Sequence, residues 1–185
     1  MNVLVVVDMQ NDFIDGSLGT PEARAIVPNV CAEILHGTYD HIFVTQDSHF
    51  KNYSSTLEGR LLPVEHCIFE TPGWKINQEV QEALNKVEQT KEVSYIVKGT
   101  FGSINLMDNL TNLHYNPKSE RVTSITFVGL CTNICVISNA LGARMVLPDV
   151  PIYVCEAACA GTAPAKHQAA IDVMRSCQIL PVKGV

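Results

Sequence analysis

The sequence predicts an α/β fold: a three-layer, doubly wound, mainly parallel sheet of six strands with helices on both faces. Short apolar runs rich in β-branched residues alternate with longer stretches of helical character along the whole chain. This alternation is typical of open α/β sheets. Most of the runs are continuously apolar, as expected of strands that are buried on both faces.

Six runs are expected to form the strands of this sheet. Valine and isoleucine dominate them, and a charged residue or a glycine follows most of them. The expected strands are residues 3–7, 41–45, 93–97, 124–128, 151–155 and a weaker sixth run, 179–182.

Five stretches between these runs are expected to form helices. Thr20 and Pro21 supply a cap and a first-turn proline for the first of them. The stretch 132–147 is apolar on most sides, which predicts a buried helix. The expected helices are residues 22–36, 77–89, 104–113, 132–147 and 164–177.

Composition limits the kind of protein. The chain has 185 residues, which suggests about one domain, and with no repeat or linker we expect a single domain over residues 1–185. A net charge of −6 argues against nucleic-acid partners. No apolar run is long enough to span a membrane, and the N-terminus lacks a basic signal-peptide start. Seven cysteines, an odd number without a CxxC pair, predict mostly free thiols and a cytoplasmic location.

Chemically active side chains gather at the ends of the expected strands. Asp8, Asp47 and Lys98 each lie at or near the end of a run, and a fourth run leads to Cys135. Ligands bind beyond the carboxyl ends of the strands in open α/β sheets. We therefore expect one pocket that contains all four residues.

Cys135 is the candidate nucleophile. It follows a strand and lies in the first turn of an expected helix, where free N–H groups and the helix dipole lower the pKa of a thiol. The same N–H groups can bind an oxyanion. The alternative is a small buried apolar residue, and Cys131 in the same turn is a rival nucleophile. The remaining cysteines are interpreted as structural: 31, 67, 155, 159 and 177.

A cysteine nucleophile needs a base, and no histidine stands at a strand end near Cys135. Asp8 is the candidate base, and Lys98 would keep it ionised and stabilise thiolate charge. Taken singly, Asp8 could instead be a turn cap and Lys98 a solvated charge. Their expected convergence on one pocket favours the catalytic interpretation.

A second group of residues has the chemistry of a metal site. Asp47 and His49 stand two residues apart on an extended segment, His66 follows, and Glu58 lies between them. Such donors suit zinc, iron, manganese or nickel. The alternative is a surface loop that binds nothing. The other histidines, 36, 41, 114 and 167, are interpreted as surface groups.

Two motifs resemble those of the isochorismatase-like cysteine hydrolases. Residues 7–13 (VDMQNDF) look like the opening of that family, and residues 129–136 (GLCTNICV) look like its nucleophile segment. With Lys98 after the third run, the resemblance implies an Asp8–Lys98–Cys135 triad, and it covers nearly the whole chain in the expected order.

Within this family, the set Asp47, His49 and His66 is similar to the metal site of the nicotinamidases (pyrazinamidases), and Glu58 fits an added ligand found in some of them. The resemblance implies one divalent ion, zinc first, with iron, manganese or nickel as alternatives. It implies hydrolysis of nicotinamide to nicotinate and ammonia, a reaction of NAD salvage. It also allows a homo-oligomer.

The resemblance implies further site features. The Leu130–Cys131 peptide bond is expected to be cis, the N–H groups of Cys131 and Cys135 are expected to form the oxyanion hole, and Phe13 is expected to pack on the substrate ring. Many nicotinamidases carry a tryptophan shortly before the histidine that matches His66, but residues 61–65 (LLPVE) contain no aromatic residue. Phe101 is the candidate replacement.

Two alternatives stay open. The triad could act on another small amide, such as a ureido or carbamoyl compound, and activity of a metal-free protein would favour that case. The chain could also be a binding protein that kept the fold without catalysis. Labelling of Cys135 by iodoacetamide much faster than that of the other thiols would favour an enzyme, and equal labelling would count against an activated nucleophile.

Overall fold

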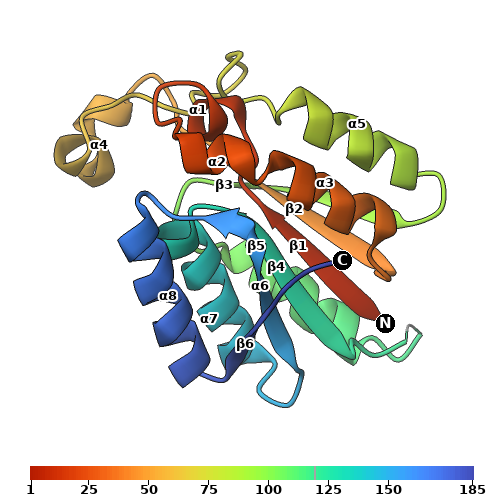
Figure 1. Cartoon of the computed structure of the whole chain (residues 1–185). Helices are drawn as coiled ribbons and strands as arrows, with labels where there is room; N and C mark the ends of the chain where they lie inside the picture. Colours follow the sequence, from red (N-terminus) through yellow and green to blue (C-terminus); the bar gives the residue numbers. More distant parts are fainter. Residues whose placement is uncertain (119) are drawn as a thin grey trace.

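The sheet has six parallel strands in the order β3-β2-β1-β4-β5-β6 (Figure 1). A computed structural model describes residues 1–118 and 120–185. The predicted fold class and all six strands are confirmed. The strands are β1 (Asn2–Val7), β2 (His41–Asp47), β3 (Glu92–Lys98), β4 (Ser124–Leu130), β5 (Ile152–Ala160) and β6 (Ile179–Val182).

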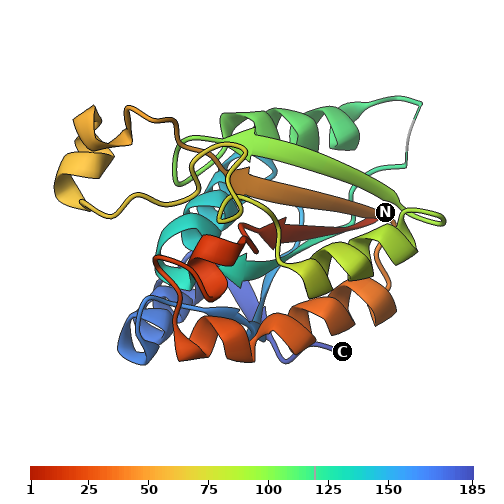
Figure 2. The same ribbon diagram turned by 90° about the horizontal axis from the view of Figure 1, so that it is seen from above.

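Helices cover both faces of the sheet, so the molecule has three layers (Figure 2). Alternate residues of β1 separate the two cores: Leu4 and Val6 belong to one apolar cluster, whereas Val5 and Val7 belong to the other. The first cluster includes α1 (Asn11–Ile14), α2 (Pro21–Ala25), α3 (Val27–His36) and α5 (Gln78–Val87). The second includes α6 (Ile104–Tyr115), α7 (Ile137–Val146) and α8 (Pro164–Ser176).

A long connection leaves the sheet between β2 and α5. It holds a short 3-10 turn, η1 (Tyr53–Ser55), and the helix α4 (Leu57–Leu61). Figure 1 shows α4 standing away from the layered body. Neither element was predicted, because each is shorter than two helical turns and therefore has no readable apolar period.

The single helix predicted over residues 22–36 is wrong, because two helices occupy that stretch. α2 ends at Ala25 and α3 begins at Val27 with Pro28 in its first turn. A proline has no N–H to donate and its ring clashes with the carbonyl four residues earlier. Pro28 therefore separates the two helices.

The helix predicted over residues 132–147 begins differently from expectation. Its first turn, η2 (Thr132–Val136), is π-helical, and α7 continues it as an α-helix. Just before this turn, β4 passes very close to β1: an added Cβ on Gly129 would meet the Val7 carbonyl oxygen at 2.2 Å. Gly129 also has a φ of 113°, so only glycine fits there.

The structure also tests smaller expectations. All seven cysteines are free thiols, as predicted. His41 was expected at the surface, but its ring is buried, packs on Phe43 and lies 3.1 Å from the Ser94 hydroxyl. In the described part of the chain, no helix is long and apolar enough to cross a membrane.

Strand order fixes where a site can form. From β1 the chain adds β2 and β3 on one side, and β4, β5 and β6 extend the sheet on the other. The order therefore reverses between β1 and β4, and a crevice is expected beyond the carboxyl ends of strands at such a point. Asp8 follows β1 there and Cys131 follows β4.

Candidate active site

The predicted triad residues meet at this reversal point. The Lys98 Nζ lies 2.7 Å from the Asp8 Oδ2 and 3.5 Å from the Cys135 Sγ. All three side chains are buried. Three segments that are far apart in sequence thus bring a carboxylate, an ammonium and a thiol into contact.

Asp8 is held in place by its backbone and by its neighbour Thr45. Its φ is 48°, a left-handed conformation that aspartate tolerates better than most residues. The Thr45 hydroxyl donates to its Oδ1 at 2.7 Å. Within residues 1–118 and 120–185, the Oδ2 finds no hydrogen bond of good angle, but the short ion pair with Lys98 neutralises it. This oxygen is therefore available to accept a proton.

The pKa of the Cys135 thiol is raised well above its usual value, first by burial and then by the charge of Asp8. This corrects the expectation that the helix N-terminus lowers it. Burial also raises the pKa of Asp8, although the charge of Lys98 lowers it. The ammonium of Lys98, 2.7 Å from the Asp8 Oδ2, favours the ionised form of this carboxylate.

Lys98 also connects the triad to the candidate metal site. Its Nζ lies 3.4 Å from the Asp47 Oδ1. Burial lowers the pKa of Lys98, but the charges of Asp8, Cys135 and Asp47 outweigh this effect and raise it. The ammonium therefore stays charged within the buried site.

The four predicted metal ligands converge. One donor atom from each of Asp47, His49, Glu58 and His66 lies within 4.8 Å of every other. The His49 Nε2 lies 3.0 Å from the Asp47 Oδ2 and 3.6 Å from the Glu58 Oε1. The His66 Nε2 lies 3.6 and 3.7 Å from the same two atoms.

This donor set fits one divalent ion. Ligands about 2.0–2.2 Å from a common zinc ion lie roughly 3–4 Å apart, as these pairs do. The buried Nε2 of His49 has no hydrogen-bond partner of good geometry in the described residues. Burial raises the pKa of Asp47, but the adjacent imidazoles of His49 and His66 and the charge of Lys98 lower it well below its usual range. An anionic carboxylate between two imidazoles suits a cation.

Surrounding groups fix these donors. The Nδ1 of His66 lies 2.9 Å from the Val64 carbonyl oxygen, which leaves Nε2 to face the other donors. The buried Gln10 amide bonds to both backbone groups of Asp47, at 2.7 Å to its N–H and 2.8 Å to its carbonyl. The same amide donates to the Trp74 carbonyl. Gln10 thereby holds the end of β2 and the later loop together.

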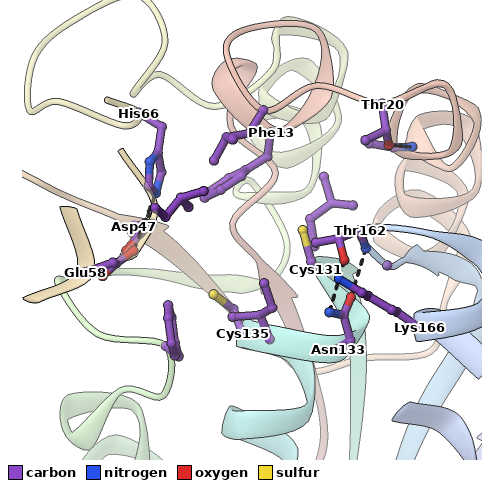
Figure 3. A pocket seen from close by; sticks show the side chains of 17 residues that line it. Phe13, Thr20, Asp47, Glu58, His66, Cys131, Asn133, Cys135, Thr162 and Lys166 are labelled. Carbon is purple, nitrogen blue, oxygen red and sulfur yellow. Dashed lines mark hydrogen bonds and ion pairs between the residues drawn. The ribbon is translucent and has the colours of Figure 1, made fainter. Parts of the chain in front are cut away.

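A cavity of about 450 Å³ opens onto both groups (Figure 3). Phe13 and Phe101, the predicted substrate contacts, line it, and so does Leu62. Leu62 belongs to the stretch that lacks the expected aromatic residue, so this part of the wall is aliphatic. Lys98 and Asp8 lie behind the lining, in contact with Cys135 and Asp47 rather than in the wall itself.

The nucleophile segment has the expected backbone. The Leu130–Cys131 peptide bond is cis, at the position that the family resemblance implied. Cys131 and Cys135 both line the cavity: Cys131 immediately precedes the π-helical turn η2, and Cys135 lies within it. Burial and then the charge of Asp8 raise the pKa of Cys131 to about 12, so that thiol stays protonated.

Sequence reasoning missed several residues that position the site. Gln10 is one, and the fully buried Asn139 is another: its Nδ2 donates to the carbonyls of Phe101 and Cys135, and its Oδ1 accepts from the Ser103 N–H. The Asp12 Oδ2 accepts from the Cys67 N–H beside His66. Gln10 and Asp12 belong to the quoted opening motif, whereas nothing in the sequence marks Asn139.

Comparison with known proteins agrees with this geometry. The isochorismatase domain family matches residues 2–182. The nicotinamidase/pyrazinamidase of Mycobacterium tuberculosis is 25% identical over 191 residues, which cover 97% of each chain. The chain therefore belongs to the isochorismatase family.

Solved structures share the fold. The pyrazinamidase/nicotinamidase of Streptococcus mutans superposes with a TM-score of 0.82 at 24% identity, covering 98% of this chain and 100% of that one. The pyrazinamidase of Pyrococcus horikoshii in complex with zinc gives a TM-score of 0.73 at 24% identity, covering 98% of each chain.

Proposed function

We propose that this protein is a metal-dependent cysteine amidohydrolase that converts nicotinamide and water to nicotinate and ammonia. The observation that carries the proposal is Lys98, whose Nζ contacts Asp8, Cys135 and Asp47 and so joins a nucleophile to a metal-ligand set. Relatives named nicotinamidase support the choice of substrate.

The triad residues divide the chemistry. Asp8 takes the proton of Cys135, and the thiolate attacks the amide carbon. The backbone N–H groups of Cys131 and Cys135 stabilise the oxyanion. Asp8 returns the proton to the departing ammonia, which leaves a thioester on Cys135. Asp8 then removes a proton from water, which hydrolyses the thioester, while Lys98 stabilises the negative charge throughout.

Asp47, His49, His66 and Glu58 would hold the divalent ion, with zinc as our first choice. Such an ion would supply a Lewis acid at this end of the cavity, where these four residues would orient the pyridine ring of the substrate. Phe13 and Phe101 pack against the ring, and Leu62 replaces the aromatic wall on the remaining side. The substrate is thus held between these side chains and the sulfur of Cys135.

The test is ammonia release from nicotinamide by purified protein, first as isolated, then after chelation, then after zinc is restored. We expect release that chelation abolishes and zinc recovers. Equal rates in all three states would remove the metal from the proposal. No release in any state would exclude nicotinamide, whereas ammonia release from another small amide that Cys135→Ala abolishes would keep a cysteine hydrolase.

A further inference from the structure

The cavity continues past the nucleophile in two directions. On one side are the metal-ligand residues Asp47, Glu58 and His66. On the other is a group that we call the polar lobe: Thr20, Asn133, Thr162 and Lys166, which all line the same cavity. Figure 3 shows Cys135 between the two groups. The nicotinamide reaction as proposed uses only the metal side.

The polar lobe is an ordered arrangement of hydrogen-bonding groups. The Asn133 Nδ2 donates to the Thr162 hydroxyl at 3.2 Å, and the Asn133 Oδ1 accepts from the Thr162 N–H at 2.9 Å. These bonds join the nucleophile turn to the loop before α8. An added Cβ on Gly161 would lie 2.9 Å from the Asn133 Oδ1, so glycine permits this close approach.

Lys166 gives the lobe a positive charge without a protein counter-charge. In Figure 3 its side chain runs toward Asn133. Among the described residues, no acidic side chain pairs with it. It also stands in the first turn of α8, where the helix dipole disfavours a cation. A cation that local electrostatics disfavours is typical of a position with a binding role.

The placement of the lobe matches one part of an amide. When the ring lies on the metal side and the carbonyl carbon at the Cys135 sulfur, the amide nitrogen faces away from the ring. A substituent on that nitrogen would point into the polar lobe. The cavity volume of about 450 Å³ falls within the ~300–1,000 Å³ of pockets for drug-sized ligands. Such a volume is larger than one ring with a primary amide needs.

We infer that the site also hydrolyses secondary amides whose amine part carries a carboxylate, which Lys166 and Asn133 bind. This inference rests on the proposed function. Cys135 attacks the amide carbon, the C–N bond breaks, and the amine leaves with the proton that Asp8 supplies. Water then cleaves the thioester. For nicotinoylglycine as the probe, the products are nicotinate and glycine.

The experiment compares three compounds: nicotinoylglycine, the neutral analogue N-(2-hydroxyethyl)nicotinamide and nicotinamide. Nicotinate release is measured by chromatography for the wild type, Lys166→Gln, Lys166→Glu and Lys118→Gln. Lys118 is exposed and precedes β4, so it lies toward the amino ends of the strands, whereas the site lies beyond their carboxyl ends. It is the matched control for loss of a positive charge.

We expect wild-type kcat/KM to favour nicotinoylglycine over the neutral analogue. Lys166→Gln should lower this ratio about five-fold, as for a partly exposed ion pair of ~1 kcal/mol, and Lys166→Glu should lower it further. Lys118→Gln should leave it unchanged. Release from nicotinamide with none from nicotinoylglycine would overturn this inference alone. A ratio that Lys166→Glu does not change would also overturn it. Failure of all three compounds would contradict the proposed function as well.

Discussion

Lys98 is the residue on which the electrostatics of the site depend. One ammonium faces two carboxylates, Asp8 and Asp47, and the thiol of Cys135, all of them buried. Removing a single charge from such a group leaves the others without compensation. The same cation that favours thiolate formation therefore also stabilises the fold.

Replacing Lys98 by methionine tests this dual role. We expect Lys98→Met to lower the free energy of unfolding by about 3–5 kcal/mol, the cost of leaving buried charge unpaired, and to abolish measurable turnover. Urea unfolding of the metal-free protein measures the first effect. An exposed control, Lys118→Met, should change neither quantity, and a Lys98→Met variant as stable as the wild type would contradict the assigned ion pairs.

His49 tests the metal-ligand set separately from the triad. We expect His49→Ala to lose the divalent ion and to raise KM, since its buried Nε2 faces Asp47 and Glu58 and has no hydrogen-bond partner among the described residues. Metal content by plasma mass spectrometry measures the loss. His36→Ala at the end of α3 is the control. Full metal occupancy in His49→Ala would show that His49 is not a ligand.

At the scale of elements, the site depends on how α7 fixes two loops. Asn139 of α7 bonds to the carbonyl of Cys135 one turn earlier and to the backbone of Phe101 and Ser103 before α6. A short π-helical turn precedes α7, and such turns are frequent at functional sites. Asn139 thus sets the position of Phe101 relative to the nucleophile.

We expect Asn139→Ala to destabilise the protein by about 2–3 kcal/mol, because it leaves buried backbone groups unsatisfied. It should also raise KM for nicotinamide more than it lowers kcat, since Phe101 loses its support. Urea unfolding and steady-state kinetics measure both effects. Asn109→Ala, an exposed change on α6, is the control. An unchanged KM would contradict the positioning role.

His41, the first residue of β2, should make the stability of the folded protein depend on pH. Burial lowers the pKa of His41, and the charge of Glu92 only partly opposes this. The unfolded chain therefore binds the proton more tightly than the folded protein does. Stability should be highest above the unfolded pKa of about 6.5 and fall as the pH drops below it. Thermal unfolding at pH 7.5 and pH 5.5 should show a smaller difference in His41→Gln than in the wild type. Equal differences would exclude His41 as the cause.

At the scale of the whole molecule, strand order converts four separate sequence segments into one site. The strands and the carboxyl-end convergence of Asp8, Asp47, Lys98 and Cys135 were predictable, because β-branched runs and their terminal polar residues are local signals. The division of helix 22–36 was also signalled locally, by Pro28. By contrast, the raised pKa of Cys135 depends on burial, which no local pattern reports.

Positioning residues were the part that sequence could not supply. Gln10 contacts the end of β2, 37 residues away in sequence, and Asn139 contacts residues 36 and 38 positions away. Their role arises only when the sheet brings these segments together. Buried amides of this kind have no periodicity or spacing that distinguishes them from ordinary helix or loop residues.

In the proposed amide hydrolase, the nucleophile and the metal site are separate parts of one cavity. The most direct measurement is metal content and ammonia release from nicotinamide, in the same preparation of Cys135→Ala, beside the wild type and the exposed control Cys177→Ala. We predict that Cys135→Ala retains its metal and releases no ammonia, while Cys177→Ala behaves as the wild type. Substantial ammonia release by Cys135→Ala would exclude Cys135 as the nucleophile.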